Sequence, residues 1–184
     1  VSTYPLIGNY GINERDFESR KVQVAGFVVR EDCPEPSHAL STSTLHDFLV
    51  AQDVPGVAGV DTRAITRRLR SRGVMLGAIT VAESPDAALG RLHEAPAYGE
   101  VDYVAQVTTD RPYGWDHPAE ARPHGTIVVY DYGLKYNVLR NLRSRGCTVV
   151  AVPAGTSAED ILARRPDGVV LSPGPGDPAL LDYA

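Results

Sequence analysis

Cysteine and long apolar stretches are scarce in this sequence, and each scarcity excludes a class of protein. The 184 residues include two cysteines, Cys33 and Cys147, which lie far apart and lack the spacing of metal ligands. We therefore expect no metal site and a reducing, cytoplasmic setting. No apolar run approaches the length that spans a bilayer, and the start does not resemble a signal peptide, so we expect no membrane association.

An excess of basic residues is also missing. Lysine and arginine number 18 against 23 aspartates and glutamates, which gives a formal net charge of −5. This balance argues against a nucleic-acid partner held by phosphate attraction. Apolar residues make up 43% and charged residues 22% of the chain, an ordinary globular composition. The length suits one large domain or two modest ones.

The last third of the chain alternates apolar runs with helical patterns. In order, these are an apolar run at 126–130, a helix ended by Gly146, an apolar run at 148–152, a short helix capped by Ser157, and an apolar run at 168–171. Short connections of this kind predict right-handed β-α-β units in a parallel sheet. We expect three parallel strands in the order 2-1-3, with the first strand central.

A loop rich in glycine and proline, residues 172–178, follows the last of these strands. Proline fixes φ and removes a donor, whereas glycine lets a backbone N–H approach a ligand closely. Such a loop could hold a main-chain N–H ready for a developing oxyanion. A stiff turn after a strand explains the same pattern, and the loop alone leaves both interpretations open.

The first half of the chain is less regular. We expect strands at 22–29 and 74–81, and helices at 44–51, from Asp61 or Thr62 to Gly73, and at 85–93 after Ser84. On the second helix, Arg63, Arg67 and Arg70 share one face. That face is either simply solvated or a docking surface for an acidic partner.

Several of these segments resemble one known family. Residues 128–140 and 171–178 resemble the start of a class I glutamine amidotransferase domain. Residues 3–13 and 56–73 resemble the amino-terminal domain found on the small, glutamine-hydrolysing subunit of carbamoyl phosphate synthetase. The resemblance covers nearly the whole chain, and the amino-terminal half makes it specific, because other amidotransferases do not carry that domain.

The resemblance implies an α/β protein in two parts. Residues 1–110 would form a mixed α/β amino-terminal domain that is incomplete at its start, and residues 111–125 a linker. Residues 126–184 would then be the first three strands of a flavodoxin-like amidotransferase domain.

The same resemblance assigns a role to the glycine loop. In the family this loop binds glutamine, so Gly174 and Gly176 are implied as substrate contacts, with the Gly174 N–H in the oxyanion hole. Pro173 departs from the asparagine of many small subunits but leaves both N–H groups in place. The family's chemistry uses a cysteine nucleophile and a histidine base. No residue here matches either, so we assign no catalytic residue and expect these 184 residues alone to be inactive.

The resemblance implies the large synthetase subunit as the partner, and if the basic face is a docking surface, we expect Arg63, Arg67 and Arg70 to contact this subunit. The large subunit would use ATP and Mg²⁺ to make carbamoyl phosphate from bicarbonate and ammonia, for arginine and pyrimidine synthesis. The small subunit would act on L-glutamine and would need no cofactor. Two alternatives stay open: an amidotransferase subunit of another pathway, such as anthranilate synthesis, and a non-enzymatic flavodoxin-like binding module.

Overall fold

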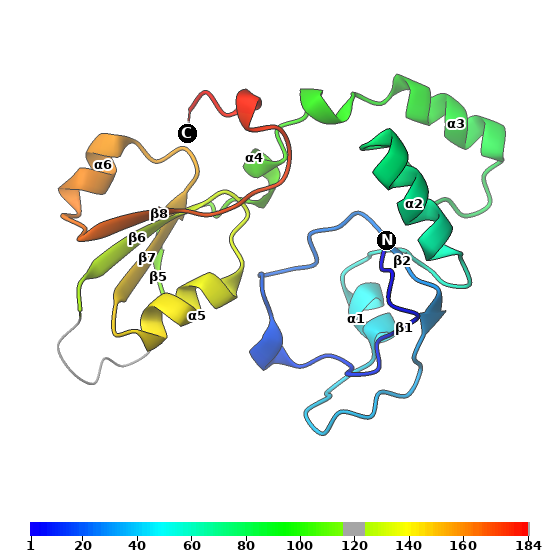
Figure 1. The fold of residues 1–184 in the computed structure, drawn as a ribbon, viewed down its shortest axis with the longest axis horizontal. Helices are drawn as coiled ribbons and strands as arrows, with labels where there is room; N and C mark the ends of the chain where they lie inside the picture. Colours follow the sequence, from blue (N-terminus) through cyan, green and yellow to red (C-terminus); the bar gives the residue numbers. More distant parts are fainter. Residues whose placement is uncertain (116–123, 184) are drawn as a thin grey trace. The chain divides into compact units, whose positions relative to one another are not determined.

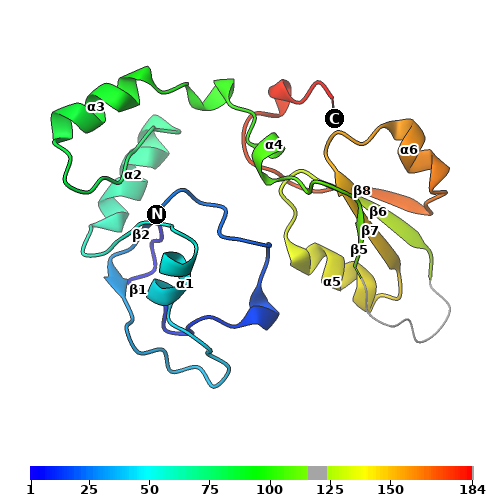
Figure 2. The ribbon, with the colours of Figure 1, turned by 180° about the vertical axis from the view of Figure 1, so that it is seen from behind.

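The computed structural model describes residues 1–115 and 124–183, and it divides the chain into two compact units. The first unit comprises Val1–Tyr98 and the second Gly99–Ala184. Figures 1 and 2 show the ribbon from opposite sides. Each unit is described by itself below. Among the described residues, no helix has both the length and the apolar character to cross a membrane.

The first unit is built on two small parallel sheets with three α-helices. Strand β1 (Leu6–Ile7) pairs with β3 (Glu31–Asp32), and β2 (Phe27–Val28) pairs with β4 (Gly56–Val57). The helices are α1 (Leu45–Ala51), α2 (Thr62–Arg72) and α3 (Pro85–Glu94). A short 3₁₀ turn, Glu14–Asp16, also lies in this unit, and a second one, Tyr98–Glu100, spans the boundary between the two units.

All three predicted helices of this unit are confirmed, because local capping defines their starts. The side chains of Thr44, Asp61 and Ser84 each accept the N–H of the residue three positions on. At the far end of α2, Gly73 has a φ of 82°, a conformation that favours glycine.

Both strands predicted in this unit need correction. The segment 22–29 is a strand only at Phe27–Val28, and 74–81 contains no strand. Val81 is 89% exposed, so the apolar residues of that second segment do not form a buried face. Alternation predicts a strand only where a neighbouring backbone is available to pair with it.

The predicted sheet of the second unit is confirmed. Its strands are β6 (Thr126–Asp131), β7 (Thr148–Pro153) and β8 (Gly168–Leu171), and its crossover helices are α5 (Tyr136–Ser144) and α6 (Ala158–Ala163). Strand β6 pairs in parallel with both β7 and β8, so the first strand is central as expected. The fold is therefore α/β, with a parallel sheet of the flavodoxin-like kind.

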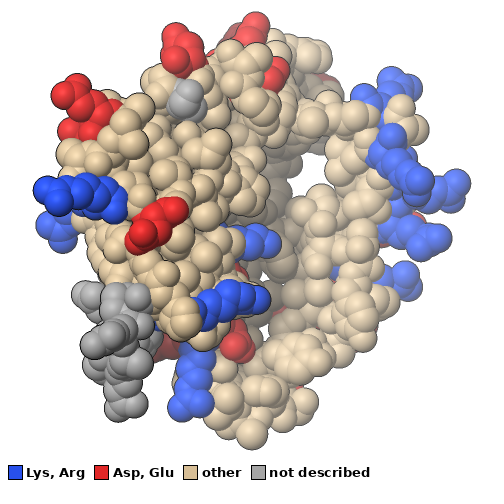
Figure 3. All heavy atoms as spheres, turned by 60° about the vertical axis from the view of Figure 1, so that its left-hand side comes forward, with Lys and Arg blue, Asp and Glu red and all other residues tan. Residues whose placement is uncertain are grey.

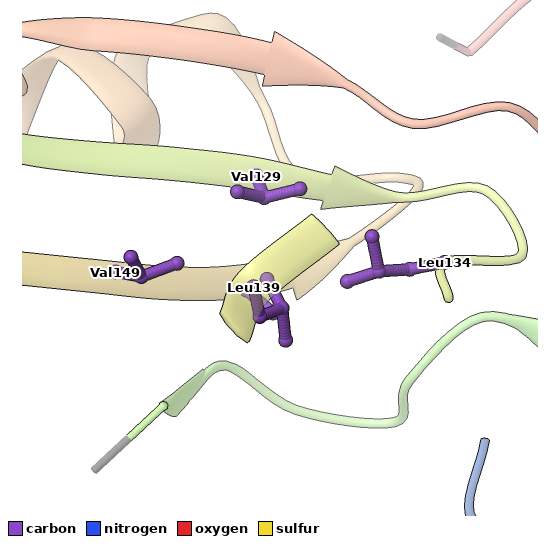
Figure 4. Close-up of a cluster of buried hydrophobic side chains, with 5 residues drawn as sticks. Val129, Leu134, Leu139 and Val149 are labelled. Carbon is purple, nitrogen blue, oxygen red and sulfur yellow. The ribbon is translucent and has the colours of Figure 1, made fainter. Parts of the chain in front are cut away.

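The two helices cover opposite faces of this sheet. Val129 and Ala151 face each other across β6 and β7 and pack with Leu139 of α5. Figure 4 shows Val129, Leu139 and Val149 together with Leu134 in this cluster. The alternate residues Val128 and Val152 pack instead with Ile161 of α6. The period of two along each strand thus supplies one apolar layer for each helix.

A fourth strand lies where a linker was expected. Strand β5 (Tyr113–Gly114) pairs antiparallel with β7, and the Trp115 N–H donates to the Val149 carbonyl at 3.0 Å. Residues 99–115 belong to the second unit, which includes the short helix α4 (Val104–Val107). The expected linker, 111–125, therefore begins inside the sheet, and its residues 116–123 lie outside the described part.

Candidate functional site

Two loops leave the carboxyl ends of neighbouring parallel strands and meet at one edge of the sheet. The first, residues 131–135, follows β6, and the second, residues 172–178, follows β8. Ser172 joins them: its N–H donates to the Tyr130 carbonyl at 3.3 Å, and its hydroxyl accepts the Tyr132 N–H at 3.0 Å. This edge of a parallel sheet is where ligands bind in open α/β folds.

Asp131 shapes the first loop. Its side chain is 7% exposed, and its Oδ1 accepts the N–H of Gly133 at 3.1 Å and of Leu134 at 2.8 Å. This is an Asx-type turn, in which a carboxylate replaces the main-chain acceptor that the ending strand no longer supplies. Gly133 completes the turn with a φ of 127°. The carboxylate is thus occupied in holding the backbone.

Gly174 is required by space. A Cβ at this position would lie 2.1 Å from the carbonyl oxygen of Tyr132, so any side chain would displace the main chain of one loop. Within the described residues, the Gly174 N–H donates no hydrogen bond to another protein group. The second loop therefore presents a main-chain donor that its own fold leaves unused.

Gly176 is required by conformation as well as by space. Its φ is 88°, and a Cβ there would lie 3.3 Å from Cδ2 of Tyr103. Pro175 packs against the first loop, since its Cδ would be 2.9 Å from a Cβ at Gly133. Both predicted site residues thus lie in a loop that is held on two sides.

Sequence reasoning missed Tyr103 and the segment around it. Val104 and Val107 have the spacing of a helix face, but a single turn is too short for periodicity to identify. Only the packing of this segment against both loops shows its place in the site.

The three predicted docking residues lie in the first unit, on α2. Arg63, Arg67 and Arg70 are all exposed. None of them forms an ion pair with a residue that the structure describes. On the face drawn in Figure 3, Lys and Arg side chains (blue) stand out from the surface, several of them along its right-hand edge.

Two family models match separate parts of the chain. Residues 1–79 match the family model for the carbamoyl-phosphate synthase small chain, CPSase domain, and residues 128–184 match that for class-I glutamine amidotransferase. A carbamoyl phosphate synthase small chain from Syntrophotalea carbinolica is 43% identical over 193 residues, covering 99% of this chain. The chain belongs to the carbamoyl phosphate synthase small chain family. The corresponding small chain of a Nostoc species is also 43% identical, over 97% of this chain, and that of Bacillus anthracis is 42% identical over 96%.

The chain spans about half the length of these curated relatives: 51%, 50% and 46%, respectively. The joining of an amino-terminal small-chain domain to an amidotransferase domain, expected from the sequence, is confirmed by the two family matches.

The contacts of the two cysteines are those of structural residues. Cys147 is half-buried and packs against the cluster between α5 and the sheet. The thiol of Cys33 donates to the Glu35 carbonyl at 3.4 Å. Neither lies on a sharp turn between a strand and a following helix, where an activated nucleophile is usually held.

Proposed function

We propose that the full-length protein is the glutamine-hydrolysing small subunit of carbamoyl phosphate synthetase. The observation that carries this proposal is the presence of both family matches on one chain. An amidotransferase subunit of another pathway, or a flavodoxin-like binding module, would not require the small-chain domain matched by residues 1–79.

The geometry of the glycine loop supports a specific part in the reaction. In glutamine hydrolysis a thiolate attacks the side-chain amide and the carbonyl oxygen gains negative charge. A rigid N–H without an internal partner stabilises that charge without any reorganisation. We assign this role to the Gly174 N–H, with Gly176 shaping the same glutamine site. The thiolate and its histidine base would come from the other half of the relatives' length.

The ammonia released would pass to a large partner subunit, which uses ATP and Mg²⁺ to form carbamoyl phosphate from bicarbonate. The small subunit itself needs no cofactor in this scheme, because the leaving ammonia and the thioester require only proton transfer and water. Arginine and pyrimidine synthesis would be the pathways served.

Comparing glutamine with ammonia as the nitrogen source tests this proposal. With the full-length protein and its large subunit, both glutamine and added ammonia should support carbamoyl phosphate synthesis, measured as product formed from labelled bicarbonate. Omitting the small subunit should abolish only the glutamine-dependent reaction. The proposal would be refuted if, with both subunits present, added ammonia supported synthesis but glutamine was neither hydrolysed nor used.

The basic face of α2 is proposed as a contact with the large subunit. Reversing the charges of Arg63, Arg67 and Arg70 to glutamate should weaken co-purification of the two subunits, because each arginine is exposed and forms no ion pair within the described part of the chain. The fold should survive, since surface substitutions usually change stability by about 0.5 kcal/mol or less.

A matched control comes from the same helix. Arg68 and Arg72 are also exposed but lie off the common face, and their reversal should affect co-purification much less. If both variants lost co-purification equally, the change in net charge would explain the loss. If the triple variant still co-purified normally, the basic face would be merely solvated.

A further inference from the structure

The segment 101–108 lies at the start of the second unit and packs beneath the two loops of the site. Val104, in α4, is 1% exposed and forms a buried cluster with Tyr132 and Ala154. In both Figure 1 and Figure 2, α4 is drawn beside the chain that follows β8. A four-residue helix is too short to be stable alone, so these tertiary contacts hold it in place.

The first contact of this segment is with the glycine loop. The Tyr103 ring and Cβ lie 3.3 and 3.7 Å from the position of a Cβ at Gly176, and the Val101 carbonyl lies 3.8 Å from it. Gly176 is thus backed by an aromatic ring on the side where other residues carry their side chain. Its left-handed φ gives the loop its turn, and the ring limits how far that turn can move.

The second contact is with the loop after β6. Cγ2 of Val107 lies 3.3 Å from the position of a Cβ at Gly133, where Pro175 approaches from the glycine loop. The next residue, Thr108, accepts the Ala154 N–H on its hydroxyl at 2.9 Å. The segment therefore touches both loops and the end of β7.

Asp102 anchors the segment at its other end. Its carboxylate accepts the Ala105 N–H at 2.9 Å and the Tyr183 hydroxyl at 2.8 Å. The bond from Ala105 lowers the pKa of Asp102, while partial burial and the bond to Asp102 raise the pKa of Tyr183 to about 12. At neutral pH the pair is therefore a carboxylate and a protonated phenol, which is a charge-assisted hydrogen bond.

We propose that residues 101–108 are the positioning element of the glycine loop, and that the Tyr103 ring is the contact that fixes Gly176 and, through it, the Gly174 N–H. The consequence for catalysis rests on the proposed function, because it assumes that this N–H meets the oxyanion. Donors must be held within a fraction of an ångström of the reacting atom, and a shift of about 1 Å can cost about 10²-fold in rate.

Two variants of the full-length protein test this element. Tyr103→Ala removes the ring, whereas Tyr103→Phe keeps it. Tyr4→Ala, at a tyrosine of the first unit that is 65% exposed, serves as the matched control. The first readout is hydrogen exchange of peptides covering 172–180 and 126–153, measured by mass spectrometry. The second is kcat and KM for glutamine, compared with ammonia-dependent synthesis in the presence of the large subunit.

Tyr103→Ala should speed exchange in 172–180 and leave 126–153 unchanged. It should lower kcat/KM for glutamine by about 10- to 10²-fold and spare the ammonia-dependent reaction. Tyr4→Ala should resemble the unmodified protein in exchange and in kinetics. Tyr103→Phe, which keeps the ring, should fall well short of Tyr103→Ala in both readouts.

The two readouts distinguish the positioning of the glycine loop by Tyr103 from the proposed part of the Gly174 N–H in catalysis. Unchanged exchange in 172–180 would overturn the positioning role whatever the kinetics show. Faster exchange over 126–153 as well would overturn it too, since Tyr103 would then support the whole sheet. Faster exchange confined to 172–180, with glutamine kinetics unaffected, would support the positioning role and count against the proposed function of Gly174.

Discussion

Replacing Gly174 by alanine is expected to lower glutamine-dependent carbamoyl phosphate synthesis by about 10²–10³-fold in the full-length two-subunit enzyme. The new Cβ would start 2.1 Å from the Tyr132 carbonyl oxygen, so the loop must move away from that backbone. Its N–H would then leave the position proposed for the oxyanion. Synthesis from added ammonia has no such dependence and should stay close to normal.

A second glycine of the same unit provides the control for this substitution. A Cβ at Gly155 would meet nothing within 4 Å, and its φ lies outside the left-handed region. Gly155→Ala should therefore leave both activities unchanged. Parallel loss of the glutamine and ammonia reactions in Gly174→Ala would mean that the loop holds the fold or the subunit contact. Full activity with both nitrogen sources would remove Gly174 from the glutamine site.

Replacing Asp131 by alanine should destabilise the second unit by about 3 kcal/mol, because the part-buried N–H of Gly133 and the buried N–H of Leu134 would lose their shared acceptor. Urea unfolding of the 184-residue chain can report this through Trp115, its only tryptophan. That side chain packs against Tyr136 and the core beside α5, so its fluorescence should follow the loss of this core.

Asp131→Asn is the matched variant for this test. Its amide oxygen can still accept both N–H groups, so it should cost much less than alanine. If alanine and asparagine were equally destabilising, the negative charge, and not the hydrogen-bond geometry, would be what the turn requires. A loss below about 0.5 kcal/mol in Asp131→Ala, the size typical of surface changes, would show that water replaces the carboxylate.

The sequence by itself determined the features that depend on local chemistry. The caps at Asp61 and Ser84 and the glycine stop at Gly73 defined helices, since a capping side chain or a left-handed φ acts within a few residues. The apolar runs of β6, β7 and β8 identified a parallel sheet, because short β-α-β connections allow one handedness. The family also followed from the sequence, because its motifs are contiguous.

Long-range contacts were decided only by the tertiary structure. Residues 22–26 and 74–81 carry apolar side chains but find no partner strand, whereas Tyr113–Gly114 pairs with β7 without any pattern that predicts it. Strand pairing depends on which backbone edge is available, and that information lies far away in the chain.

The candidate site shows the same division. Its glycines could be identified from the sequence, because glycine between prolines marks an unusual backbone. The contacts that require glycine at these positions could not be predicted from the sequence. Gly174 faces a carbonyl 42 residues earlier in the chain, at Tyr132, and Gly176 faces a ring at Tyr103. Such close approaches arise only when the loops after β6 and β8 and the segment before β5 pack together, so tertiary structure alone determines how the loop is held.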